Sequence, residues 1–302
     1  MHLSSKQIVI VAGPTAVGKT SVAINIARHF KTQIISADSR QCYKELNIGV
    51  ARPSEEELAA VPHHFIASHS IFQKVTAATF EEYALQNAEE LFGQHDTIVM
   101  VGGTGLYLKA FAEGMDAIPE VPEALHNEII AAYNAAGLQW LQEQIRTLDP
   151  LFWQEGETKN PQRLMRSLEV MKATGRSIID FQKGAKKQRP FNIIKAALEL
   201  PKEELHRNIN NRVDKMMEDG LLEEVKAMRP HQHLNALQTV GYKEVFAFLN
   251  GETSLPEAVE AIKRNTRRYA KRQLTWFRKD KEYDWFPPDA AEVIKRLQLQ
   301  KE

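Results

Sequence analysis

The sequence has 302 residues but only one cysteine, Cys42, and it has no long apolar run. A single cysteine excludes an intrachain disulfide and a cysteine-based metal site, and it is typical of proteins in a reducing compartment. No segment approaches the roughly 20 apolar residues that span a bilayer. The apolar stretch near the start is also too short for a signal peptide. We therefore expect a soluble, cytoplasmic protein with no membrane anchor.

The sequence also lacks an excess of either charge, since 39 Lys and Arg balance 39 Asp and Glu. Contact with nucleic acid would therefore require a local basic patch. The apolar fraction of 43% suffices for a packed core, and the length suits one large domain or two. Composition does not determine the oligomeric state, and we take a monomer as the expectation.

Strands and helices alternate at the start of the chain. The β-branched run at 7–12 and the apolar runs at 34–35 and 98–101 are typical of buried parallel strands. Helical spacing of apolar residues follows the first strand and recurs at 80–91. This alternation predicts an α/β domain with a parallel sheet.

The pattern becomes helical after Gly114, beyond a stretch with two prolines. Asn160-Pro161 is a good helix start and Gly175 a good helix stop. Residues 192–200 predict a strand that returns to the first domain, followed by more helices. We therefore expect a core of residues 1–114 and 190–302, interrupted by a helical insertion at 115–189.

A phosphate-binding motif follows the first predicted strand and opens a predicted helix. The sequence GPTAVGKT matches G-x-x-x-x-G-K-S/T. Backbone amides of such a loop converge on phosphate oxygens, and the helix adds its positive end. The motif residues are Gly13, Pro14, Thr15, Ala16, Val17, Gly18, Lys19 and Thr20. Lys19 would contact the terminal phosphate, and the Thr20 hydroxyl would ligate Mg²⁺, but the motif does not identify the polyphosphate.

Two features that usually accompany this loop are missing. The strand at 98–101 runs into Gly102-Gly103-Thr104-Gly105, without the acidic residue that normally helps to hold Mg²⁺. The guanine-reading string N-K-x-D is absent as well. These absences argue against a motor protein or a GTPase.

A different carboxylate, Asp38, follows the strand predicted at 33–37. Ligands bind at the carboxyl ends of strands in open parallel sheets, so we expect Asp38 near the phosphate loop. There it would accept a proton from a nucleophile. Capping of a turn is an equally common role for such an aspartate. The neighbouring Arg40 and Gln41, whose side chains suit the edge of a base, favour the functional interpretation.

Several blocks, in this order, resemble the bacterial tRNA dimethylallyltransferases (tRNA isopentenyltransferases) over almost the whole length. They are GPTAVGKT at 13–20, SADSRQCYKELNIG at 36–49, GGTGLY at 102–107, NPQRLMRSLEV at 160–170, RVDKMMEDGL at 212–221, VGYKE at 240–244 and TRRYAKRQLTWFR at 266–278. The resemblance implies a P-loop nucleoside-triphosphate-hydrolase-like fold. It also implies dimethylallyl transfer from dimethylallyl diphosphate to the exocyclic amino group of the adenosine 3′ of the tRNA anticodon.

The same resemblance implies roles for single residues. Asp38 would be the catalytic base, Lys19 and Arg212 would stabilise the departing diphosphate, and Mg²⁺ would bind at Thr20. The residues implied in binding the tRNA anticodon stem-loop, besides Asp38, are Ser39, Arg40, Gln41, Thr104, Gln162, Arg163, Leu164, Met165 and Arg166. The family often carries an arginine where this chain has Leu125-His126, so the resemblance does not assign an RNA contact to this position.

Near the end of the chain, residues 262–281 hold nine Lys or Arg against one acid, Asp280. Val259, Ile262, Tyr269 and Trp276 recur there at helical spacing. This pattern predicts a helix that packs by its apolar stripe and offers basic flanks to RNA phosphates. Solvated charge is the more common meaning of such a run, but the local excess of positive charge in a protein with no net charge favours RNA contact here.

Two other functions fit part of the sequence. A small-molecule kinase would combine a nucleotide in the phosphate loop with Asp38 as the acceptor base. An RNA-binding module with a vestigial nucleotide fold would retain the basic helix, but the intact Lys19, Thr20 and Asp38 argue against it.

Overall fold

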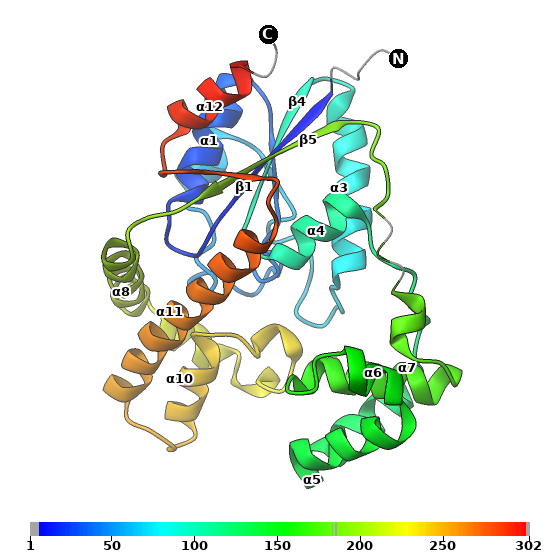
Figure 1. Cartoon of the computed structure of the whole chain (residues 1–302). Coiled ribbons are helices and arrows are strands. Elements are labelled where there is room, and N and C mark those ends of the chain that lie inside the picture. The colour runs from blue at the N-terminus through cyan, green and yellow to red at the C-terminus, as the bar shows by residue number, and fades with distance from the viewer. Residues whose placement is uncertain (1–5, 183, 185, 300–302) are drawn as a thin grey trace. The chain divides into compact units, whose positions relative to one another are not determined.

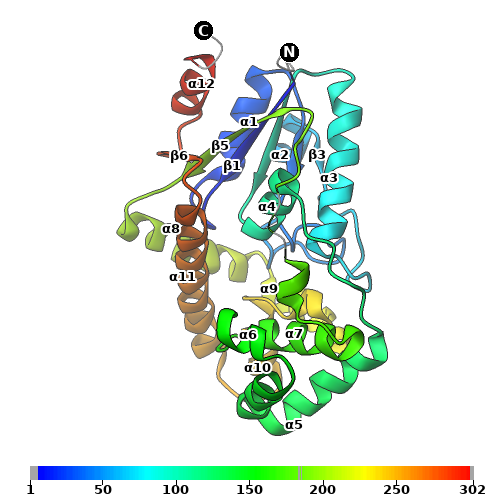
Figure 2. The same ribbon diagram turned by 45° about the vertical axis from the view of Figure 1, so that its right-hand side comes forward.

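The computed structural model describes residues 6–182, 184 and 186–299. The chain divides into two compact units. The first, here called the α/β unit, runs to residue 112 and resumes at residue 188, and the second, the helical unit, spans residues 113–187. Each unit is described separately below (Figures 1 and 2).

The α/β unit is built on a parallel sheet of six strands in the order β3-β2-β4-β1-β5-β6. The strands are β1 (Gln7–Ala12), β2 (Ile34–Ser36), β3 (His63–His64), β4 (Thr97–Gly102), β5 (Asn192–Leu198) and β6 (Tyr283–Phe286). Every residue of β1 and β4 is buried, as their continuous apolar sequences predict. The predicted α/β class with a parallel sheet is confirmed.

Helices cover both faces of this sheet. The helices of the unit are α1 (Lys19–His29), α2 (Glu55–Ala60), α3 (Ala77–Phe92), α4 (Gly105–Glu113), α8 (Lys202–Glu218), α9 (Leu221–Ala227), α10 (Tyr242–Leu249), α11 (Leu255–Lys279) and α12 (Ala290–Leu299), with short 3-10 turns η2 (Arg229–His231) and η3 (Asn235–Leu237). Of these, α8 to α11 pack on one another beyond one end of the sheet rather than on its faces (Figure 1). Val9, Val11 and Val99 point to the face on which α1 and α12 pack. Figure 2 shows α3 and α4 on the opposite face.

The sequence missed the last two elements of this unit. β6 pairs in parallel with β5, and α12 packs on α1 beside it. β6 has only four residues, Tyr-Asp-Trp-Phe, at the edge of the sheet, where neither an apolar run nor a long alternation marks a strand. The end of β5 was also predicted too late, since the strand stops at Leu198 rather than residue 200.

The helical unit contains α5 (Glu123–Leu148), α6 (Pro150–Glu155), α7 (Pro161–Thr174) and the 3-10 turn η1 (Ile178–Phe181). α5 is broken at Gly137, which has a φ of 76° and a ψ of −170°. α7 starts and stops as predicted, because the Asn160 side chain accepts hydrogen bonds from two backbone amides and Gly175 ends the helix in a left-handed conformation. The core of the helical unit includes Ile129, Leu141 and Leu168.

Candidate active site

The phosphate loop lies between β1 and α1, as the motif requires. Gly13 has a φ of 146°, and a Cβ there would lie 2.8 Å from the Leu198 carbonyl oxygen of β5. Only glycine fits this backbone conformation and this close approach. α1 begins directly after the loop at Lys19, so its amides and the positive end of its dipole adjoin the loop.

Lys19 bends back over this loop, and its Nζ donates a hydrogen bond to the Pro14 carbonyl oxygen at 2.7 Å. Burial and, to a smaller extent, the positive charge of Arg212 lower the pKa of Lys19 to about 7, while the negative charge of Asp38 partly opposes them. An ammonium in this situation is stabilised by any anion that joins it. The Lys19 ammonium is therefore suited to contact a phosphate group.

Arg212 extends from α8 to the loop, where its Nη1 donates to Thr15 Oγ1 at 3.3 Å. Its neighbour Val213 belongs to the buried stripe of α8, which brings the half-buried guanidinium inward. Burial lowers the pKa of Arg212, while the charges of Glu57 and Asp38 act in the opposite direction. The arginine that the sequence places beside a buried stripe thus adds a second cation at the phosphate loop.

Asp38 follows β2 and forms a turn. Its Oδ1 accepts hydrogen bonds from the backbone amides of Arg40 at 2.8 Å and Gln41 at 3.3 Å. No hydrogen bond among the described residues uses the second carboxylate oxygen, Oδ2. The Asp38 charge acts on both Lys19 and Arg212. Because β2 and β1 both flank β4, their carboxyl ends open at one edge of the sheet, and this places the three groups near one another.

The other residues predicted near the base hold the loops around Asp38. Thr104 Oγ1 accepts from the Ser39 amide at 3.1 Å and donates to Ser39 Oγ at 3.3 Å. Arg40 Nη1 donates to the Asn235 carbonyl oxygen at 3.0 Å. Gln41 Nε2 donates to the Ala51 carbonyl oxygen at 2.7 Å. The side-chain groups predicted to recognise a base thus also fix the loop that carries Asp38.

Sequence reasoning missed two site residues on α11. The Tyr269 hydroxyl interacts with Thr104, and burial, reinforced by the Asp38 charge, raises the pKa of Tyr269 to about 12. The buried Gln273 contacts both the phosphate loop and the loop after β4. Their spacing of four residues puts them on one side of the helix, but the sequence predicted only packing for Tyr269.

A third missed residue is Glu224 of α9. Its carboxylate accepts hydrogen bonds from the backbone amides of Asn47 at 3.1 Å, Ile48 at 2.8 Å and Gly49 at 3.0 Å, and from the Tyr242 hydroxyl. This anchor fixes the end of the loop that starts at Asp38. Neither glutamate nor tyrosine has a spacing signal that would have shown this contact.

On α7 the structure corrects part of the predicted tRNA-binding stretch. Leu164 is fully buried and Met165 is 5% exposed, and both belong to the core of the helical unit. Their side chains are therefore unavailable to a tRNA. Gln162 and Arg163 are exposed at the start of the helix. A five-residue helical stretch covers more than one turn, so part of it must face inward.

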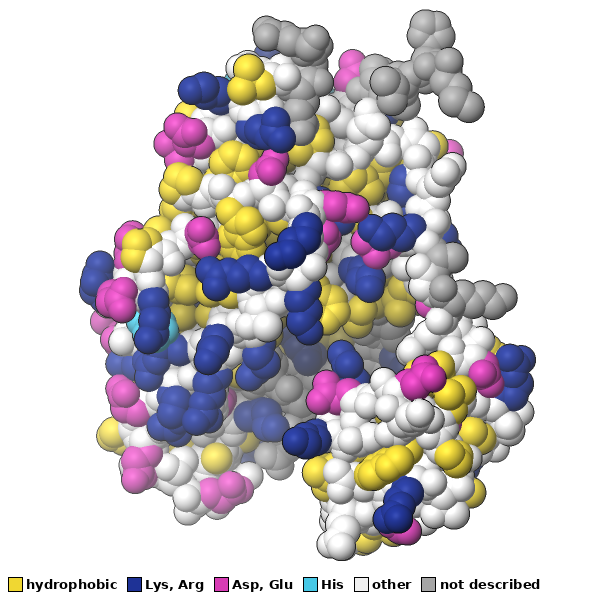
Figure 3. All heavy atoms as spheres, in the orientation of Figure 1, with side chains coloured by type: hydrophobic (Ala, Val, Ile, Leu, Met, Phe, Trp, Pro, Cys, Tyr) yellow, Lys and Arg dark blue, Asp and Glu magenta, His cyan; other side chains and the backbone are white. Residues whose placement is uncertain are grey.

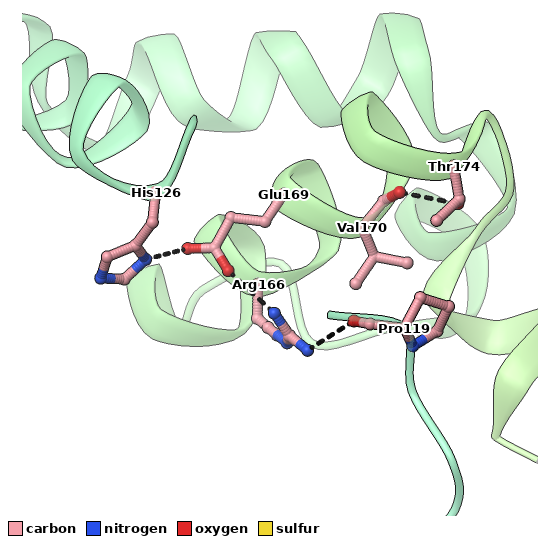
Figure 4. Close-up of polar contacts among 6 residues, drawn as sticks. All are labelled: Pro119, His126, Arg166, Glu169, Val170 and Thr174. Atoms are coloured by element: carbon pink, nitrogen blue, oxygen red, sulfur yellow. Dashed lines mark hydrogen bonds and ion pairs between the residues drawn. The ribbon is translucent and has the colours of Figure 1, made fainter. Parts of the chain in front are cut away.

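Arg166 of α7 lies at the surface but has partners within its unit. Its Nη1 donates to Glu169 at 3.2 Å and its Nη2 to the Pro119 carbonyl oxygen at 3.3 Å. Figure 4 shows His126 on the other side of the same carboxylate, with Nδ1 2.7 Å from Glu169 Oε1. His126 therefore pairs with Glu169, at the position where the family often has an arginine.

Basic side chains gather over α11 in the α/β unit (Figure 3). Six basic residues of α11 are exposed, and four of them, Arg264, Arg268, Lys271 and Arg272, lie in its middle. In the described part of the chain none of the four forms an ion pair. The predicted helix is present and amphipathic, but its buried side is formed by Ala258, Ile262, Ala270 and Phe277, and of the predicted stripe only Ile262 is buried, while Trp276 is exposed. Its open charges suit a polyanion.

Within the described ranges, no helix is both long and apolar enough to cross a membrane.

Comparison with known proteins gives one consistent result. The sequence model of a family described as IPP transferase matches residues 41–280. The tRNA dimethylallyltransferase of Christiangramia forsetii is 46% identical over 285 residues, which cover 94% of each chain. That of Cytophaga hutchinsonii is 44% identical over 288 residues and 95% of each chain.

Solved structures agree with the sequence relatives. The tRNA isopentenylpyrophosphate transferase of Bacillus halodurans matches with a TM-score of 0.70 at 34% identity, over 97% of this chain and 94% of that one. A eukaryotic dimethylallyltransferase acting on tRNA matches with a TM-score of 0.71 at 25% identity, over 90% of this chain and 69% of that one. The phosphate loop, the Asp38 turn and these likenesses together show that the chain belongs to the IPP transferase family.

Proposed function

We propose that this protein transfers a dimethylallyl group from dimethylallyl diphosphate to the exocyclic amino group of the adenosine 3′ of the anticodon in tRNA. The observation that carries the proposal is Asp38, whose Oδ2 is open among the described residues and whose charge acts on Lys19 and Arg212. The curated relatives with 44–46% identity are tRNA dimethylallyltransferases. Their names supply the substrates, and the site supplies groups suited to them.

The reaction breaks the C–O bond between the prenyl carbon and the diphosphate and forms a C–N bond to the adenine amino group. Charge moves onto the diphosphate as the C–O bond breaks, so cations fixed in advance stabilise the transition state. The loop amides, Lys19 and Arg212 would provide this stabilisation. The amino proton would pass to Asp38 Oδ2 as the C–N bond forms.

The Thr20 hydroxyl of the loop would hold a magnesium ion beside a bound diphosphate. Mg²⁺ prefers oxygen ligands and commonly takes one or two from the protein and the rest from phosphates and water. The Thr20 hydroxyl follows Lys19 in the first turn of α1, and it donates to no described residue. Bound there, the ion would neutralise charge on the leaving diphosphate. A carboxylate after β4 is not needed for a reaction that activates no water.

The tRNA would bind through its phosphates and present one base to Asp38. We assign the phosphate contacts to the open charges of α11 and to Gln162, Arg163 and Arg166 of the helical unit. Such contacts position the RNA without reading its sequence. The target base must leave its stack, which costs a few kcal/mol and least in a loop. Ser39, Arg40, Gln41 and Thr104 would then surround the base.

A small-molecule kinase would use the same loop and the same aspartate, but the relatives do not favour it. One experiment separates the two functions. The protein is incubated with labelled dimethylallyl diphosphate and an unmodified anticodon stem-loop, then with labelled ATP. We expect label in the RNA from the prenyl donor only, and none when guanosine replaces the target adenosine. Transfer of phosphate from ATP without prenyl transfer would reject the proposal.

Two further expectations are independent of this chemistry. The monomeric state would be tested by light scattering of the protein during size-exclusion chromatography. The cytoplasmic location would be tested by fractionation of cells that express the tagged chain.

A further inference from the structure

Gln273 lies in the middle of α11 and is only 6% exposed, which is unusual for a polar side chain with no charge partner. Both ends of its amide are bonded. Oε1 accepts a hydrogen bond from the Thr15 amide at 2.9 Å, and Nε2 donates to the Gly103 carbonyl oxygen at 2.9 Å. One side chain therefore joins the phosphate loop to the loop that follows β4.

These two loops belong to the two halves of the proposed reaction. The phosphate loop would hold the prenyl donor, and in this loop the Thr15 hydroxyl also accepts a hydrogen bond from the Arg212 guanidinium. On the acceptor side, Gly103 precedes Thr104, whose amide donates to Ala37 and whose hydroxyl bonds to Ser39. Ala37 and Ser39 flank Asp38. A short series of hydrogen bonds thus runs from the phosphate loop through Gln273 to the residues on either side of Asp38.

The close packing around the Gln273 amide also shows how closely this side chain fits the loop after β4. A Cβ placed on Gly103 would lie 2.3 Å from Gln273 Nε2. Residue 103 and Gln273 are therefore fitted to each other, and any side chain at 103 would push the amide away from its partners.

We propose that Gln273 is a positioning residue that fixes the distance between the phosphate loop, which would hold the prenyl donor, and Asp38. The proposal rests on the proposed function, because it assumes that the two loops hold the two reactants. Gln273 does not touch the reacting atoms. Its removal would leave each loop able to bind its own ligand but would loosen their alignment. A displacement of about 1 Å in a reacting geometry can lower the rate by about 100-fold.

The test compares Gln273→Leu with the unchanged protein in four measurements. We expect kcat to fall by about 10- to 100-fold, while the affinity for inorganic pyrophosphate, the affinity for the anticodon stem-loop and the melting temperature change little. A kcat per folded molecule equal to that of the unchanged protein would overturn the proposal. A loss confined to pyrophosphate affinity would also overturn it, because Gln273 would then serve the phosphate loop alone.

Gly103→Ala tests the same contact from its other side. Alone, it should lower kcat like Gln273→Leu, because the added methyl displaces the amide. In a Gln273→Ala background the same change should cost little, since the clash has gone. Additive losses in the double variant would contradict the proposal. Thr275→Ala, at an exposed position on the same helix, is the matched control and should leave kcat unchanged.

Gln273→Glu keeps the argument testable if Gln273→Leu does not fold. The carboxylate still accepts from Thr15 but cannot donate to Gly103 until it is protonated. Activity relative to the unchanged protein should therefore rise as the pH falls. A ratio that does not depend on pH would reject the role of the donated bond. If the unchanged protein transfers no prenyl group at all, the proposed function fails instead, and pyrophosphate affinity still reports on the loop.

Discussion

The two units of this protein treat their charged side chains differently. In the α/β unit Asp38 uses one oxygen to accept the amides of a turn, and its other oxygen accepts no hydrogen bond among the described residues. Four exposed basic residues of α11, Arg264, Arg268, Lys271 and Arg272, form no ion pair among the described residues, whereas Lys263 and Arg278 of the same helix do. In the helical unit Asp149 is fully buried and accepts from Phe152, Ser167 and Ser177. The difference separates a structural carboxylate from a reactive one, because the oxygens of Asp149 are all bonded within the fold, whereas Asp38 keeps an oxygen for a substrate.

Arginines follow the same division. Arg163 and Arg166 on α7 pair with Glu157 and Glu169 inside the helical unit. Among the described residues, the guanidinium groups of Arg268 and Arg272 on α11 interact with the Asn265 side chain and the Tyr269 ring, and neither forms an ion pair. Exposed ion pairs contribute little to stability, about 0–1 kcal/mol. The pairing therefore mainly reduces the positive charge that α7 offers to RNA, compared with that of α11.

The largest expected effect is at the open carboxylate. Asp38→Asn retains an oxygen for the amides of Arg40 and Gln41 but removes the proton acceptor. We expect kcat to fall by about 10²- to 10⁴-fold, with the melting temperature and the affinity for tRNA nearly unchanged. Steady-state kinetics, thermal melting and a filter-binding assay measure the three quantities. Equal losses of binding and turnover would show that Asp38 is structural.

The saturated carboxylate should respond in the opposite way. Asp149→Ala leaves two buried hydroxyls and one amide without their acceptor. We expect the free energy of unfolding to fall by about 3 kcal/mol, while kcat per folded molecule stays close to that of the unchanged protein. Urea denaturation gives the stability, and Asp149→Asn, which keeps one acceptor oxygen, should lose less. A catalytic defect without a loss of stability would contradict the comparison.

Charge reversal on α11 should weaken tRNA binding. Arg268→Glu together with Arg272→Glu is expected to lower the affinity and to reduce the slope of log affinity against log salt by about 2, one for each lost phosphate contact. Arg296→Glu, at an exposed arginine paired with Asp284, is the control. If the double variant and the control behave alike, tRNA does not lie along α11.

The smallest expected effect is a pH dependence of donor binding. The pKa of Lys19 lies at about 7 in the free protein, well below its ordinary value. Above pH 7 the lysine must therefore take up a proton when a diphosphate binds, and affinity falls as the pH rises, by at most about tenfold per pH unit. Calorimetry with inorganic pyrophosphate in buffers of different ionisation enthalpy counts this proton.

Lys19→Arg serves as the reference for that measurement, because an arginine keeps its charge throughout the range. The ratio of affinities between the two proteins removes the titration of pyrophosphate itself. A ratio that stays constant from pH 7 to pH 9 would place the Lys19 pKa above this range and would count against a buried, Arg212-flanked ammonium.

Prediction from sequence worked best where a signal is local. The phosphate loop has a fixed spacing, and the buried strands before and after it are short apolar runs, so both were located correctly. The N-cap Asn160 and the stop at Gly175 are local signals as well. Prediction from sequence failed at β6, whose pairing partner β5 lies far away in the sequence. It also failed at Leu164 and Met165, because the resemblance over 160–170 does not distinguish the inner face of α7 from its outer face.

The sequence by itself determined the class of fold and the position of the phosphate-loop motif between a strand and a helix, since each is encoded within a few consecutive residues. It marked Asp38 as a candidate proton acceptor, and the resemblance to the family favoured that role over a turn cap. The tertiary structure alone decided which groups meet. Tyr269 and Gln273 come from a helix more than 230 residues beyond Asp38, and only the parallel order of β2, β4 and β1 opens the strand ends at the same edge. Contacts of that kind depend on packing between distant segments, for which a single sequence holds no spacing rule.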